Sequence, residues 1–243
     1  KGGYPMAKIP LRLYTREIEN LINQGQTEEA IAHCRHILQT YPKYIEAYRL
    51  MGNAFLESQQ FGEANDLFQR VLSVFPDDFI AHAGISIIRE DEGNLEAATW
   101  HMERAFEAQP SNSAVQAELK RLYGRRDGIA PPKVRLTRGA LVRMYAKGDL
   151  YHQAIAEIKA ALKEDPNRLD LLTILARMYY SAGQKVDAAE ICSNLLNKYP
   201  NCFEANKLLA DILPETSRAD DAEVYKERVI AIEIGRASCR ERV

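Results

Sequence analysis

Apolar positions recur every three or four residues along most of the chain, which is the spacing of amphipathic helices. Leu67, Val71 and Val74 form one such stripe. Short polar turns interrupt the stripes, mostly with a glycine where a helix must stop, as in "EDEGNLEA" and "SAGQKVDAA". A proline, which cannot continue a helix, commonly follows the second helix of a pair. The pattern predicts an all-α chain of helix–turn–helix pairs.

The pairs recur with a fixed period, which is the signature of a repeat protein. Prolines are spaced 34, 34, 56 and 34 residues apart, at Pro42, Pro76, Pro110, Pro166 and Pro200. Alanines near the start of each second helix take the same steps, at Ala30, Ala64, Ala98, Ala154, Ala188 and Ala222. Since alanine is small, we expect the two backbones of each pair to approach closely there.

A 34-residue repeat with these residue types resembles the tetratricopeptide repeat (TPR) family. The best copy, Tyr48 to Pro76, carries the family's signature spacings at Tyr48, Met51, Gly52, Phe55, Ala64, Phe68 and Pro76. The resemblance covers about residues 11 to 230. It implies an α-solenoid, a right-handed superhelix with a concave groove, because no single repeat can bury its apolar face alone.

The 56-residue step marks a break in the array, and the stretch "GRRDGIAPPKVRLTRG" lies within it. Residues 113–124 predict a lone helix that caps three repeats, and Arg135 is expected to begin the next helix. We therefore predict two units joined at about residues 125–134. Residues 11–124 would hold three repeats and the capping helix, and residues 135–232 two repeats and a partial third.

The linker region is basic, and two interpretations of it stay open. It is either a solvated joint or a patch that binds an anion, an acidic tail or the backbone of RNA. Apart from Tyr123, no aromatic residue that would stack bases is interleaved in this stretch, which argues against nucleic acid. The basic residues are Lys120, Arg121, Arg125, Arg126, Lys133, Arg135 and Arg138.

Both ends of the chain look foreign to the repeat. Residues 1–10 are expected to be an N-terminal extension in which "KGG" resembles a bacterial ribosome-binding site and Met6 is the native start; a fragment that begins inside a longer protein is the alternative. Residues 233–243, "EIGRASCRERV", resemble a translated sequencing adapter and are expected to be a non-native tail. Together these features predict a bacterial gene fragment.

Composition narrows the class of protein further. The formal net charge is -2, so no strong attraction to nucleic acid or to a membrane surface is expected for the whole chain. No apolar run approaches the roughly 18 residues that a membrane span needs. The four cysteines are scattered and fit a reducing compartment, so a cytoplasmic location is expected.

No motif for chemistry stands out, so an enzyme, a cofactor and a metal are not expected. GxxxxGK[ST], GxSxG and HExxH do not occur. His33, Cys34 and His36 are the nearest approach to a metal cluster, and we interpret them as one packed cysteine between exposed histidines. Trp100 is predicted to serve packing rather than recognition.

The resemblance implies a peptide-binding groove lined by two positions of each first helix, four residues apart. The candidate peptide-binding residues are Arg49, Asn53, Arg143, Arg177 and Lys207. Arg49 and Asn53 resemble half of the family's carboxylate clamp, but the third repeat has Ala83, Gly84 and Ile87 where the clamp needs cations. Arg143 and Arg177 are one repeat apart and could each bind a carboxylate. The alternative is that they belong to an ordinary solvated face.

The sequence therefore predicts a non-catalytic, cytoplasmic scaffold that binds a peptide or protein segment, with an acidic segment among the candidate ligands and no membrane contact. Two alternatives stay open: a self-association module, and the recognition arm of a larger protein whose active domain lies elsewhere. The partner and the oligomeric state are not predicted, because function is only loosely linked to this fold.

Overall fold

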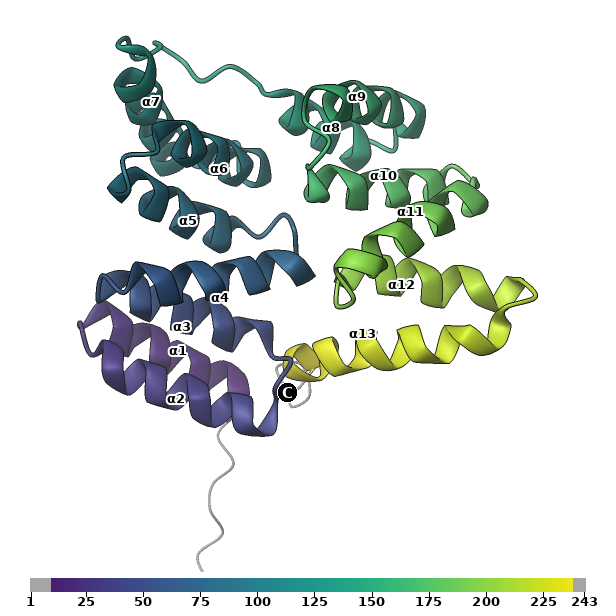
Figure 1. Ribbon diagram of the computed structural model, residues 1–243, viewed down its shortest axis with the longest axis horizontal. Helices are drawn as coiled ribbons and strands as arrows, with labels where there is room; N and C mark the ends of the chain where they lie inside the picture. The colour runs from purple at the N-terminus through teal and green to yellow at the C-terminus, as the bar shows by residue number, and fades with distance from the viewer. Residues whose placement is uncertain (1–9, 238–243) are drawn as a thin grey trace, which may run out of the picture. The chain divides into compact units, whose positions relative to one another are not determined.

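The computed structural model describes residues 10–237, and every regular element in that range is helical (Figure 1). The expected start at Met6 and the end of the expected non-native tail lie outside the described residues, although the last helix runs into that tail as far as Ala237. The helices are α1 (Leu11–Asn23), α2 (Thr27–Thr40), α3 (Ile45–Glu57), α4 (Phe61–Val74), α5 (Phe79–Asp91), α6 (Leu95–Ala108), α7 (Ser113–Asp127), α8 (Arg138–Lys147), α9 (Tyr151–Glu164), α10 (Leu169–Ser181), α11 (Lys185–Lys198), α12 (Phe203–Ile212) and α13 (Ala222–Ala237), with two short 3-10 turns, η1 (Leu213–Glu215) and η2 (Ala219–Asp221), before α13.

The helices form the predicted helix–turn–helix pairs, and the all-α solenoid class is confirmed. Six pairs are present, α1/α2, α3/α4, α5/α6, α8/α9, α10/α11 and α12/α13, while α7 has no partner helix of its own. The alanines predicted to allow close approach are all almost completely buried, at Ala30, Ala64, Ala98, Ala154, Ala188 and Ala222. Burial of these small side chains is what brings the helices of a pair together.

The contacts divide the described chain into two units. Unit 1 comprises residues 10–67 with 230–237, and unit 2 comprises residues 68–229, so the boundaries fall inside α4 and α13. In unit 1, α1, α2 and α3 pack on one another. In unit 2, α5, α6 and α7 pack in chain order, as do the helices from α8 to α12. α8 contacts α10 and α10 contacts α12, as expected for stacked repeats.

A recurring hydrogen bond fixes the start of most repeats. A side chain six residues after the repeat's proline donates to that proline's carbonyl oxygen. The pairs are Tyr48 with Pro42 (2.8 Å), His82 with Pro76 (3.1 Å), Gln116 with Pro110 (2.6 Å) and Asn206 with Pro200 (3.0 Å). Pro166 is the exception, because the residue six positions later is Leu172, which has no donor.

The predicted lone helix exists, but it is longer than expected. α7 continues through Gly124 to Asp127 and ends at Gly128, whose φ of 82° is the left-handed conformation that ends many helices. Gly124 is used differently, since Ala130 folds back against it and would lie 3.1 Å from an added Cβ. The next helix begins at Arg138 rather than Arg135, because Thr137 caps it by accepting from the backbone N–H of Ala140.

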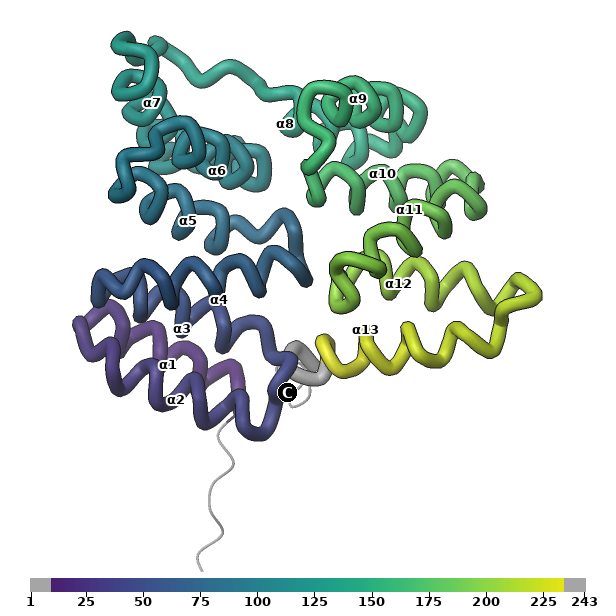
Figure 2. Tube along the Cα trace, in the orientation of Figure 1, coloured from purple at the N-terminus to yellow at the C-terminus, as the bar shows by residue number. Residues whose placement is uncertain are grey.

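The segment between α7 and α8 is irregular and mostly exposed (Figure 2). Helices on its two sides nevertheless belong to the same unit. α6 contacts α8 directly, and Ala140 of α8 joins the apolar cluster that α6 and α7 form around Met102 and Leu119. The division by contacts falls at residues 67/68 and 229/230 and is a different division from the predicted joint at residues 125–134. The predicted joint therefore stays a prediction.

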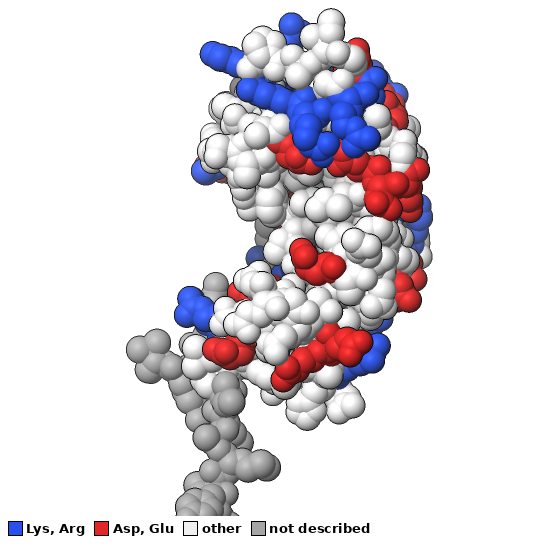
Figure 3. Space-filling model, turned by 90° about the vertical axis from the view of Figure 1, so that its left-hand side faces the viewer, with Lys and Arg blue, Asp and Glu red and all other residues white. Residues whose placement is uncertain are grey.

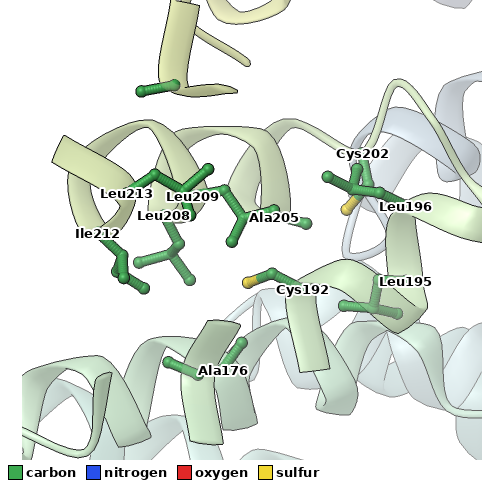
Figure 4. Packing of buried hydrophobic residues seen from close by; sticks show 12 residues of the cluster. Ala176, Cys192, Leu195, Leu196, Cys202, Ala205, Leu208, Leu209, Ile212 and Leu213 are labelled. Carbon is green, nitrogen blue, oxygen red and sulfur yellow. The ribbon is translucent and has the colours of Figure 1, made fainter. Parts of the chain in front are cut away.

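Farther along unit 2, the core is built from small and medium side chains. The side chain of Cys192 on α11 lies between Ala176 of α10 on one side and Ala205 and Leu208 of α12 on the other (Figure 4). Cys192 and Ala205 are at most 1% exposed. Three helices can therefore meet closely at this point, and the cysteine acts as a small apolar residue.

Two glycines provide a test of how tightly this packing is determined. A Cβ at Gly84 would collide with the ring of the fully buried Phe68, so Gly84→Ala should lower the free energy of unfolding by about 1–3 kcal/mol through overpacking. Gly62 lies in α4 with no atom within 4 Å of the same position, so Gly62→Ala should raise it by about 0.5–1 kcal/mol. Urea unfolding of both variants measures the difference; equal effects would contradict the packing described.

Candidate functional site

The structure divides the predicted groove residues between the two units. Arg49 and Asn53 lie on α3 in unit 1, whereas Arg143, Arg177 and Lys207 lie on α8, α10 and α12 in unit 2. Arg49 is paired with Glu46, one turn earlier on the same helix, and Asn53 is half-buried. Lys207 is exposed.

Arg143 and Arg177 are brought together in the wall of one cavity, the arginine cavity. It has a volume of about 400 Å³ and opens among α8, the start of α9 and α10. Three of its eight lining residues are cations and one is an acid. The lining residues are Arg143, Ala146, Lys147, Asp149, Tyr151, Arg177, Met178 and Ser181.

The two arginines differ in how firmly the protein holds them. Arg143 donates to Asp77 at 3.2 Å and to Asp170 at 3.3 Å, and its side chain is 19% exposed. Arg177 is 47% exposed, and among residues 10–237 its one acidic contact is with Glu204 at 3.8 Å. Arg143 is therefore fixed by acids of the fold, and Arg177 is the arginine whose guanidinium is accessible to a ligand.

Arg143 stands at the end of a buried network of ion pairs centred on Glu107. The carboxylate of Glu107 has no solvent exposure and accepts from Arg104 at 3.1 Å and from Arg168 at 2.5 Å. Thr137 adds a third donor at 2.8 Å. Arg168 also donates through Nε and Nη2 to Asp170, both at 2.8 Å.

This network joins residues from both sides of the segment between α7 and α8. Burial would raise the pKa of Asp170, but the hydrogen bonds and charge of Arg168, with Arg143 and His82 nearby, lower it to about 2. Asp170 is therefore ionised at neutral pH, and the acids and bases of the network balance one another. Sequence reasoning missed this network, because Glu107 and Arg168 are 61 residues apart and follow no repeat spacing.

The basic residues predicted as a patch are mostly neutralised within the fold. Glu90 accepts from both Arg121 and Arg125, and the hydrogen bond from Arg121 is the main reason that the pKa of Glu90 is lowered. Figure 3 shows the side of the molecule that lies at the left in Figure 1. Basic side chains gather there toward the α7 end, directly against acidic side chains. Arg126 and Arg138 are also ion-paired, whereas Lys120, Lys133 and Arg135 have no acidic partner among residues 10–237.

A second cavity, of about 260 Å³, lies in unit 2 around Trp100 and is called the tryptophan cavity. We predicted a packing role for Trp100, and part of its side chain has one, since its Nε1–H donates to Asp165 at 3.0 Å and Arg104 lies over its ring. The ring also lines the cavity. The lining residues are Gln69, Leu72, Ser73, Pro76, His82, Trp100, His101, Asn167, Leu169, Asp170 and Tyr199.

His82 and His101 form a hydrogen-bonded pair in the wall of this cavity, with 2.9 Å between their Nδ1 atoms. Burial is the main reason that the pKa of His82 is lowered. Burial, followed by the neighbouring His82, Arg89 and Arg104, lowers the pKa of His101 to about 3. Both rings are therefore neutral near pH 7.

In the described part of the chain, the buried cysteines and His33, which the sequence offered as candidates, make packing and hydrogen-bond contacts within the fold. Burial raises the pKa of Cys34 and Cys192 to about 12 and that of Cys202 to about 11, so these thiols are poor nucleophiles. His33 accepts or donates a hydrogen bond with Tyr14 at 2.7 Å. Within residues 10–237 no group of three or more His, Cys, Asp or Glu side chains is arranged to hold a metal ion. No helix in the same range has both the length and the apolar character that crossing a bilayer requires.

The chain is similar to known repeat proteins. The family model described as Tetratricopeptide repeat matches residues 21–86 and 147–212, which together are more than half of the chain. Superkiller protein 3 of Schizosaccharomyces pombe (strain 972 / ATCC 24843) is 26% identical over 199 residues, covering 79% of this chain and 12% of that protein.

Two solved structures are also similar. The Naa15/Naa10 structure with bound HypK-THB has 16% identity and a TM-score of 0.45, covering 94% of this chain and 39% of that chain. The pilF structure of Pseudomonas aeruginosa has 14% identity and a TM-score of 0.38, covering 96% of each chain. The chain thus spans only a minor part of the length of Superkiller protein 3 and of the Naa15/Naa10 chain.

The Glu107 network predicts a large loss of stability when its centre is removed. Glu107→Ala leaves Arg104 and Arg168 without their shared acid, and breaking a buried pair in this way should cost about 3–5 kcal/mol of unfolding free energy. Glu215, 61% exposed and paired with Lys185 at the surface, is the matched control, and Glu215→Ala should hardly move the midpoint. Urea unfolding is the measurement. Similar midpoints for the two variants would show that Glu107 is not a central contact.

The neutral histidine pair predicts a pH dependence of stability. His101 has a pKa near 6.5 when unfolded and about 3 when folded, so between these values the unfolded state binds the proton and the folded state does not. The unfolding free energy should therefore fall as the pH drops from about 6.5 toward 3. His101→Phe should flatten this slope, and His36→Gln, at an exposed position, should not. Denaturant titrations across that pH range decide between these outcomes.

Proposed function

The chain belongs to the tetratricopeptide repeat family, and from that premise we propose that it is a non-catalytic scaffold that binds an acidic segment of a partner protein at the arginine cavity. Repeats of this family typically act as interaction modules for other proteins. The observation that supports the acidic ligand is the concentration of Arg143, Lys147 and Arg177 around one cavity with a single acid, Asp149.

The proposal gives these cations different roles. The exposed ion pair of Arg177 with Glu204 is long and contributes little, so a ligand carboxylate can replace Glu204 at small cost. An arginine fork can then bind both oxygens of that carboxylate. Lys147 is exposed and adds a point charge. Arg143 is held by Asp77 and Asp170, which offset its charge, so its role is to shape the wall of the cavity.

Arg49, Asn53 and Lys207 stay predicted peptide contacts in this proposal. Lys133 and Arg135, the exposed residues of the basic patch without an acidic partner among residues 10–237, stay a secondary candidate. The bacterial origin and the cytoplasmic location also stay predictions, as do the two alternatives of self-association and of service as the recognition arm of a longer protein. Light scattering at several concentrations tests the first alternative.

The proposal is tested with a labelled synthetic peptide that has glutamate at alternate positions, compared with the same peptide carrying glutamine. Fluorescence anisotropy at low salt should show binding of the glutamate peptide and little binding of its neutral counterpart. Arg177→Ala should weaken binding by about 1–3 kcal/mol, which is the scale of a charged hydrogen bond. Helical circular dichroism should be unchanged, since the substituted side chain is largely exposed.

Lys226→Ala is the matched control for that test. Lys226 is a similarly exposed cation on α13 that pairs with Glu223 and does not line the arginine cavity. If Lys226→Ala weakens binding as much as Arg177→Ala, the attraction is a general effect of charge and the proposed site is wrong. Equal binding of the two peptides would exclude an acidic ligand.

A further inference from the structure

The hydrogen bonds of the histidine pair determine where its protons lie. The carbonyl oxygen of Pro76 can only accept, so Nε2 of His82 carries the proton in their 3.1 Å contact. Because His82 is neutral, its Nδ1 has a lone pair. The 2.9 Å contact between the two Nδ1 atoms then requires the proton on Nδ1 of His101.

The consequence is an open acceptor at the tryptophan cavity. His101 is neutral and protonated on Nδ1, so its Nε2 has a lone pair, and no donor from residues 10–237 reaches that atom. Nε2 of His101 is not among the fully buried atoms that lack a partner, so water can reach it. A ligand that supplies an O–H or N–H there replaces that water and keeps the hydrogen bond, whereas a ligand without a donor displaces the water and leaves the acceptor unpaired.

The charges around the cavity favour a neutral ligand. Both oxygens of Asp170 already accept from Arg168, and one of them also accepts from Arg143. A cationic ligand would find Asp170 neutralised and Arg104 close by, over the ring of Trp100. An anionic ligand would meet the lone pair of His101, whose ring burial keeps unprotonated.

The walls and the size of the cavity favour an aromatic ring. Trp100, Tyr199 and Leu72 provide aromatic and apolar surface on different elements of unit 2. The volume of about 260 Å³ is below the roughly 300–1,000 Å³ of sites for drug-sized molecules, so it suits one side chain rather than a whole cofactor. Tyrosine and tryptophan combine such a ring with one polar hydrogen.

We propose that the tryptophan cavity binds a tyrosine or tryptophan side chain of a partner segment, whose O–H or N–H donates to Nε2 of His101 while the ring packs on Trp100. This rests on the proposed function in taking the ligand to be a protein segment. The ion pair between Asp170, which lines this cavity, and Arg143, which lines the arginine cavity, connects the two sites. The preferred segment therefore carries an aromatic residue near an acidic one.

The test uses two small probes that differ in one hydrogen-bond donor. p-Cresol is the side chain of tyrosine, and 4-methylanisole has the same ring with its O–H methylated. Trp100 is the single tryptophan of the chain, so its fluorescence reports directly on this cavity. p-Cresol should change the emission saturably and bind about fivefold or more tightly than 4-methylanisole, which is the ratio expected for one added hydrogen bond.

Two variants separate the acceptor from the cavity. His101→Phe keeps a ring and removes Nε2, so the preference for p-cresol over 4-methylanisole should disappear. Ser73→Leu fills the cavity from half-buried Ser73, near the end of α4, and should abolish binding of both probes. If His101→Phe does not fold, nitrogen NMR of the histidines in the unmodified chain replaces it: p-cresol should shift Nε2 of His101 and leave Nε2 of His82 in place.

The outcomes are distinct from those of the acidic-peptide test. Arg177→Ala should leave p-cresol binding unchanged. Linear, unsaturable quenching, equal affinity for the two probes, or a preference that survives in His101→Phe would each overturn the aromatic site while the acidic site stands. Saturable p-cresol binding without any binding of the glutamate peptide would overturn the proposed function and leave the aromatic site intact.

Discussion

The packing of unit 2 depends on one buried carboxylate, that of Glu107. An ionised acid without solvent is costly unless donors surround it, so its burial constrains where its partners lie. Arg104 comes from the same helix, Thr137 from the cap of α8 and Arg168 from the approach to α10. Gly139 belongs to the same arrangement, because a Cβ at that position would overlap the carboxylate of Glu107.

The same ion pairs determine the character of both cavities. Asp170 pairs with both Arg168 and Arg143, and Arg143 also pairs with Asp77, so the ion pairs form one continuous chain. Part of the wall of each cavity is therefore fixed by buried charge, whereas Arg177, with one long contact to Glu204, can change its partner. Buried ion pairs are weak evidence for stability in themselves, and their clearer effect here is to select one arrangement of α6, α8 and α10.

Features that repeat could be predicted from the sequence, and features that occur once could not. The spacing of the alanines and prolines predicted the helix pairs and the burial of the alanines, because the same packing contact recurs in every repeat. Helix ends were less certain: two glycines, Gly124 and Gly128, stand close together, and only the backbone shows which one takes the left-handed conformation. Asp78 and Asn112 cap α5 and α7 with side-chain hydrogen bonds, whereas Arg168 and Cys202, which stand at the starts of α10 and α12, do not.

The candidate site shows the same division. Arg143 and Arg177 could be placed on one cavity wall by their 34-residue spacing. The sequence did not show that Asp77, 66 residues from Arg143, accepts a hydrogen bond from Arg143. The tryptophan cavity was missed because its walls come from α4, α5, α6, the start of α10 and the end of α11, with no common spacing. Two histidines 19 residues apart and a lone tryptophan were the available signals.

The repeat that begins at Pro166 lacks the side-chain hydrogen bond to its proline carbonyl oxygen that most other repeats have. The same repeat supplies Arg168 and Asp170 to the network around Glu107. Its start is positioned by residues far away in the chain rather than by its own helix. Repeat arrays are usually treated as exchangeable modules whose stabilities add between neighbours. In this chain that modularity stops at Pro166: a graft that moves this repeat without α6 would separate Arg168 from the buried Glu107, so α6 and this repeat must be transplanted together.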